Sequence, residues 1–127
     1  MRKVVNGAVP AGTTFRVHVE CGNGGVTTVN RDLLFDSTGQ PTAGTVPTIA
    51  ARPTDSCSLS ETGTGGALSV AYGCSDNDTT GNALCQANGR DVIYGDTVGQ
   101  RATVTVTNTF ANPAASQLVT VTPRFTG

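Results

Sequence analysis

Two polar residues of this 127-residue chain fall where strand alternation would place apolar residues, and Lys3 is a third candidate for the interior. Glu61 lies on the apolar face of the alternating run 56–62, and Asn108 lies on the apolar face of the run 100–110. Lys3, the only lysine, precedes two valines in the strand-like run 2–6. A buried carboxylate, amide or amine is costly unless it finds a polar partner. We therefore expect the three side chains to meet inside the fold.

A lysine, a glutamate and an asparagine in an apolar pocket can form an isopeptide bond. Burial favours the neutral amine, which is the nucleophile. The carboxyl group can polarise the carboxamide and carry protons from the amine to the departing nitrogen. Ammonia then leaves, and Lys3 is joined to Asn108 with the assistance of Glu61, mainly because the fold holds the groups together. This would be a single self-modification, and we expect no enzymatic turnover.

Each of the three residues also has an ordinary structural interpretation. Lys3 could be a solvated residue of an edge strand. Glu61 could begin a turn, and Asn108 could hydrogen-bond to the backbone near a bulge. If the assumed register of a strand is shifted by one residue, its inner and outer faces are exchanged. The true register of each strand therefore decides between the two interpretations.

The composition predicts an all-β domain. Thr and Val favour strands, 16 glycines and 6 prolines favour turns, and the helix formers Lys, Glu and Met total only four residues. About seven to nine short strands separated by turns favour an immunoglobulin-like β-sandwich. The expected strands are residues 2–6, 14–21, 26–35, 46–50, 56–62, 67–72, 90–94, 100–110 and 117–122.

We expect one sandwich domain over residues 1–110. Residues 111–127 would then be a linker followed by an extra strand, which belongs either to the same domain or to the start of a next repeat. No leader-like apolar stretch comes before the first run, so an exported protein would be longer than this chain. No apolar run is long enough to span a membrane. A net charge of −1 without a basic stripe argues against nucleic-acid binding.

The four cysteines, Cys21, Cys57, Cys74 and Cys85, predict two disulfides and an oxidising compartment. Three connectivities are possible. With one histidine and no C-x-x-C pair, neither a metal site nor a cofactor is expected. The Asp76–Asp78 segment carries oxygen ligands that suit calcium, but it falls short of an EF-hand loop, so a solvated polar loop is the alternative.

Three segments resemble a known kind of repeat. They are G-A-V-P-A-G-T-T-F-R-V-H-V-E-C, C-S-L-S-E-T and V-T-V-T-N-T-F, and the match runs from about Lys3 to Phe110. Together they resemble a repeat domain of large actinobacterial surface proteins and the B-type repeat of the collagen-binding adhesin family. The resemblance implies a prealbumin-like immunoglobulin fold, an isopeptide between Lys3 and Asn108 assisted by Glu61, and neighbouring repeats as partners.

The same resemblance pairs Cys21 with Cys57, which leaves Cys74 with Cys85. It also implies an extracellular location on a bacterial surface. The function that we expect is therefore a stalk or spacer module. The alternative is a ligand-binding tip, lectin-like or receptor-binding, that presents the loops 37–44 and 74–85, although aromatic residues are only 5% of the chain. His18 is expected on an outward face, and no serine has catalytic partners at a known spacing, so a hydrolase is not indicated.

Overall fold

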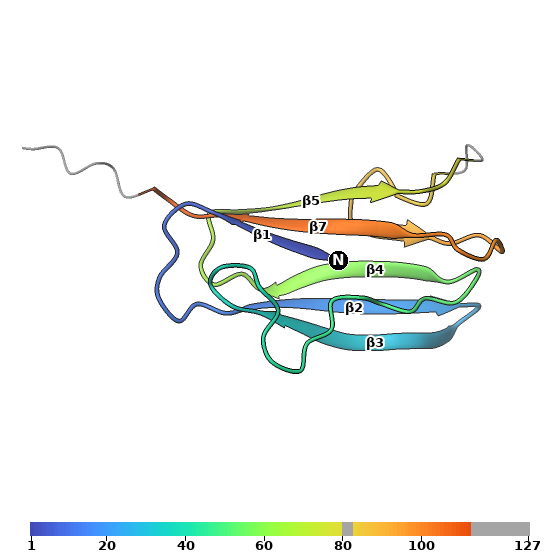
Figure 1. The fold of residues 1–127 in the computed structure, drawn as a ribbon, viewed down its shortest axis with the longest axis horizontal. Coiled ribbons are helices and arrows are strands. Elements are labelled where there is room, and N and C mark those ends of the chain that lie inside the picture. Colours follow the sequence, from blue (N-terminus) through green and yellow to red (C-terminus); the bar gives the residue numbers. More distant parts are fainter. Residues whose placement is uncertain (80–82, 113–127) are drawn as a thin grey trace, which may run out of the picture.

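The computed structural model describes residues 1–79 and 83–112, and within them it is an all-β sandwich of seven strands (Figure 1). The described residues contain no helix long and apolar enough to cross a membrane. The strands are β1 (Arg2–Asn6), β2 (Phe15–Asn23), β3 (Val26–Phe35), β4 (Ser56–Gly63), β5 (Ser69–Asp76), β6 (Asp91–Ile93) and β7 (Ala102–Thr109).

The strands form two sheets that pack face to face (Figure 1). One sheet has the order β1-β7-β5 and the other β3-β2-β4-β6. All neighbours are antiparallel except β1 and β7, which run parallel, with Lys3 opposite Val106. The immunoglobulin-like sandwich predicted from the sequence is confirmed in its two layers and its strand number. Among the described residues the first and last strands, β1 and β7, are direct neighbours.

Alternating burial explains the core. Along β2 every second residue points inward, and Phe15, Val17 and Val19 are buried. β4 and β7 repeat the pattern, so that apolar side chains of both sheets meet in one layer. The other buried apolar residues are Cys21, Leu33, Phe35, Cys57, Leu59, Leu84, Val92, Val104, Val106 and Phe110.

Two predicted strands differ from the structure. Residues 46–50 are not a strand, because their carbonyl groups are held by a side chain: Arg31 Nη2 donates to the oxygens of Val46 and Thr48 at 3.1 and 2.8 Å. The strand predicted at 67–72 begins later and runs to Asp76, because β7 offers a partner as far as Ala102. The linker from residue 113 onward and the strand predicted at 117–122 lie outside the described residues.

The outer edge of β1 is covered by the loop that follows β3. Asp36 Oδ1 accepts hydrogen bonds from the backbone of Thr38 and Gln40 and so closes this loop. Gly39, at φ +83°, lies so close to β1 that a Cβ atom there would be 3.0 Å from the carbonyl oxygen of Lys3. A side chain at this position would therefore push β1 away from the loop.

Candidate functional site

Lys3, Glu61 and Asn108 converge in the interior of the sandwich. Lys3 and Asn108 come from the adjacent parallel strands β1 and β7, and Glu61 comes from β4 in the facing sheet. Asn108 is 0% exposed, and the side chains of Lys3 and Glu61 are also 0% exposed. The interpretation of Lys3 as a solvated edge residue is therefore wrong.

The three side chains form a closed set of hydrogen bonds. Lys3 Nζ donates to Glu61 Oε1 at 2.7 Å and to Asn108 Oδ1. Asn108 Nδ2 donates to the same Glu61 Oε1 at 3.1 Å. One carboxylate oxygen therefore contacts both the amine nitrogen and the carboxamide nitrogen, while Glu61 Oε2 is buried without a hydrogen-bond partner among the described residues.

The surroundings of the amine are apolar. Lys3 Nζ lies 4.6 Å from the centre of the Phe15 ring, and that ring packs edge-on against Phe110 at 6.0 Å between centres. Burial lowers the pKa of the Lys3 amine below its ordinary value, against the opposing effects of the hydrogen bond and the charge of Glu61. A neutral amine, which can act as a nucleophile, is thereby favoured.

The backbone next to Glu61 orients the carboxamide of Asn108. The ladder between β2 and β4 shifts between Arg16 and Val17: Val17 pairs with Glu61 and Arg16 pairs with Gly63, so Thr62 is the extra residue of a bulge. The chain then turns, and the carbonyl oxygen of Thr64 accepts a second hydrogen bond from Asn108 Nδ2 at 3.1 Å. These contacts direct the nitrogen of the carboxamide toward Glu61 and its oxygen toward Lys3.

Tyr72 is a site residue that the sequence analysis missed. Its hydroxyl oxygen accepts a hydrogen bond from the backbone N–H of Glu61 at 2.8 Å. The sequence shows Tyr72 only as the end of an expected strand, and no local pattern indicates a contact with a backbone group of the facing sheet.

Both disulfides are present, so the expectation of disulfides is confirmed. Cys21 and Cys57 are bonded and face each other in the register of β2 and β4. Cys74 is bonded to Cys85 and ties the end of β5 to the segment before β6. These are the pairs that the resemblance implied. Disulfides are typical of proteins from oxidising, non-cytoplasmic compartments.

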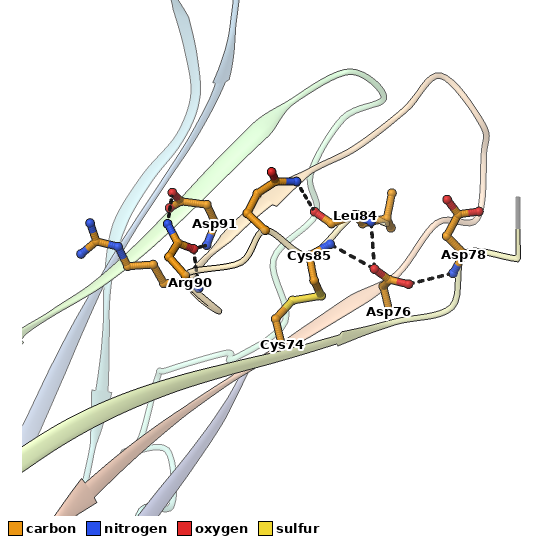
Figure 2. The surroundings of a disulfide bond; sticks show 9 residues. Cys74, Asp76, Asp78, Leu84, Cys85, Arg90 and Asp91 are labelled. Atoms are coloured by element: carbon orange, nitrogen blue, oxygen red, sulfur yellow. Dashed lines mark hydrogen bonds between the residues drawn. A yellow bond between two sulfur atoms is a disulfide. The ribbon is translucent and has the colours of Figure 1, made fainter. Parts of the chain in front are cut away.

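The Asp76 carboxylate accepts hydrogen bonds from three backbone N–H groups (Figure 2). Asp76 Oδ2 accepts hydrogen bonds from the N–H groups of Leu84 and Cys85 at 2.8 and 3.0 Å, and Oδ1 accepts one from the N–H of Asp78 at 3.2 Å. Chiefly the Cys85 N–H lowers the pKa of Asp76 below its ordinary value. Across residues 1–79 and 83–112, no group of three or more His, Cys, Asp and Glu side chains could hold a metal ion.

The histidine lies apart from this interior site. His18 is on the outward face of β2, where its Nδ1 is 2.8 Å from Asp32 Oδ1 of the neighbouring strand β3. This contact joins two strands at the surface and brings no nucleophile to the histidine.

Comparison with known proteins yields one family. The family described as Domain of unknown function (DUF5979) matches residues 1–111, a span that contains all three residues of the interior site. No curated protein and no solved structure matches the chain.

Proposed function

The chain belongs to the DUF5979 family, and we propose that this domain is a structural module of a bacterial cell-surface or adhesin protein, in which an isopeptide bond between Lys3 and Asn108 fastens the first strand to the last. The domain is a spacer and not an enzyme with turnover. The observation that carries the proposal is the buried contact of Lys3 Nζ with both the carboxamide of Asn108 and the carboxylate of Glu61.

The chemical step uses only these three side chains. The Lys3 amine reacts in its neutral form, which burial favours. The Nζ lone pair attacks Asn108 Cγ and forms the new C–N bond. One amine proton passes to Glu61 Oε1 and from there to Nδ2, the Cγ–Nδ2 bond breaks, and ammonia leaves. The products are an amide and ammonia, so no oxidant and no further reactant is needed.

The geometry supports Glu61 as the proton carrier. Its Oε1 is 2.7 Å from the nitrogen that must lose a proton and 3.1 Å from the nitrogen that must gain it. A single oxygen can therefore serve both transfers without moving far, within the reach expected of a general acid–base. Because the site is closed to water, the neutral amine competes with no solvent nucleophile.

The covalent framework supports a structural role. A bond between Lys3 and Asn108 would close a covalent loop that contains nearly the whole domain. The two disulfides already fix β2 to β4 and β5 to the segment before β6. The resemblance to repeats of surface proteins gives the proposed setting, with neighbouring repeats of the same polypeptide as partners. The oxidising compartment indicated by the disulfides agrees with the surface of a bacterium.

Intact mass under reducing and denaturing conditions tests the proposal. The wild-type chain is expected to be lighter than its calculated mass by one ammonia, and peptide mapping should join the peptide of Lys3 to that of Asn108. Since Lys3 is the only lysine, the mapping is unambiguous. Glu61→Gln should restore the full mass, whereas Asn6→Ala, which changes an exposed asparagine of the same strand as Lys3, should keep the bond. A wild-type chain of full calculated mass would refute the proposal.

A further inference from the structure

We infer that Tyr72 is a positioning residue for the cross-linking reaction: its hydroxyl holds Glu61 at the place where one oxygen contacts both nitrogens. This inference rests on the proposed function. In this inference β5, which contributes none of the three reacting side chains, fixes the position of Glu61 on β4.

The contact spans the two sheets. Tyr72 lies on β5, opposite Val106 of β7 and therefore two residues from the position of Asn108 on β7. Glu61 lies on β4 of the facing sheet. The hydroxyl of Tyr72 accepts the backbone N–H of Glu61 at 2.8 Å, so the sheet that holds Lys3 and Asn108 also holds the backbone of Glu61.

The other polar contacts at the site involve the reacting atoms themselves. The bonds from Lys3 Nζ and from Asn108 Nδ2 to Glu61 change as protons move, and the bond from Asn108 Nδ2 to Thr64 is lost with the ammonia. The bond from Glu61 N–H to Tyr72 contains no reacting atom. It can therefore keep the carboxyl group in place before, during and after the step.

The local backbone explains why such a support matters. Thr62, the next residue after Glu61, is the extra residue of the bulge, so the ladder with β2 is interrupted beside the proton carrier. A displacement of a catalytic group by about 1 Å can cost about a hundredfold in rate. The Tyr72 hydroxyl limits this displacement from the side opposite the ladder.

The experiment compares rates of bond formation in full-length chains that differ by one hydroxyl. Each chain is refolded with its disulfides formed in mildly acidic buffer, where protonation of the amine holds the reaction back, and is then brought to neutral pH. Samples are quenched in denaturant and the loss of ammonia is followed by intact mass. Tyr72→Phe is expected to react roughly tenfold to a hundredfold more slowly than the wild type.

Tyr94→Phe is the matched control, because the chain has two tyrosines and the Tyr94 hydroxyl also bonds to a backbone group, that of Ala102. This variant should lose similar thermal stability and keep the wild-type rate. The comparison of Tyr72→Phe with Tyr94→Phe separates a positioning role from a general loss of structure.

The outcomes are distinct. If the wild type forms the bond and Tyr72→Phe forms it at the same rate, or if Tyr94→Phe is slowed equally, the assignment of Tyr72 is wrong while the proposed function stands. If the wild type never loses ammonia, the proposed function itself fails, and with it the role of Tyr72.

Discussion

Replacing Lys3 by methionine is expected to lower the free energy of unfolding by about 4 kcal/mol, because the variant cannot form the proposed isopeptide and lacks its loop constraint. Methionine has nearly the length of the lysine stem and no charge, so it should fit beside the Phe15 ring. In the cross-linked wild type Nζ is a neutral amide nitrogen. The variant therefore differs from it mainly in chain connectivity.

The magnitude follows from the path that the bond closes. Lys3 and Asn108 are 105 residues apart in the sequence. In the oxidised unfolded chain the two disulfides shorten this path to about sixty residues, for which the chain-entropy estimate gives about 4 kcal/mol. For a domain of this size the loss corresponds to a fall in Tm of roughly 15 °C. Glu61→Gln should lose more, because it also leaves the buried amine of Lys3 without its counter-charge.

The Tm of both variants is measured by thermal unfolding followed by circular dichroism. The mass of each chain is checked first. Asn6→Ala, which keeps the bond, supplies the reference. If Lys3→Met has the Tm of the cross-linked wild type, loop closure does not stabilise this domain and the reasoning is refuted. If Lys3→Met is less stable than Glu61→Gln, the stated cost of the unpaired amine is wrong.

Three further predictions concern the disulfide, the amine and the loop. In the Lys3→Met chain, replacing Cys21 and Cys57 by alanine should cost about 4 kcal/mol in urea unfolding, because their bond closes 36 residues; an unchanged midpoint would contradict this. The rate of bond formation should increase with rising pH and level off below pH 10.5, the ordinary lysine pKa, because burial lowers the pKa of Lys3 and the neutral amine reacts. Rates measured by intact mass that still increase above pH 10.5 would contradict this prediction. Chiefly the Cys85 N–H lowers the pKa of Asp76, so its ionised carboxylate should contribute its full stabilisation above the ordinary aspartate pKa, and this contribution should decline below that pKa and be lost as the pH falls through the lowered pKa. Asp76→Asn should reduce that acid dependence in urea titrations, and an identical pH profile would argue against it.

Alternation along the strands made much of the fold and site predictable. The runs that contain Val17, Leu59 and Val106 alternate cleanly, and in the structure these residues are buried as the pattern indicates. The same parity places Glu61 and Asn108 inward, because a β-strand changes face with every residue. The run around Lys3 is too short to fix its face from the sequence, and burial of Lys3 is decided by the parallel pairing with β7.

Features that depend on contacts between segments far apart in the sequence were not predictable. The hydrogen bond from Glu61 to Tyr72 joins strands whose relative position no local pattern encodes. The bulge at Thr62 follows from register with β2, and the carbonyl of Thr64 is a backbone group without a residue-type signal. The segment at Val46 resembles a strand in composition, but a side chain of β3 holds its carbonyl oxygen.

The parallel pairing of β1 with β7 sets how the domain would respond to tension between its ends. Because the two strands run in the same direction, a pull toward the N-terminus on β1 and toward the C-terminus on β7 slides one strand along the other, and the ladder from Arg2 to Asn6 is loaded all at once. With a covalent link at Lys3 and Asn108, the load would pass from the start of one strand to the end of the other. Residues 4–107 would then bear none of it, and the domain could be stretched without unravelling.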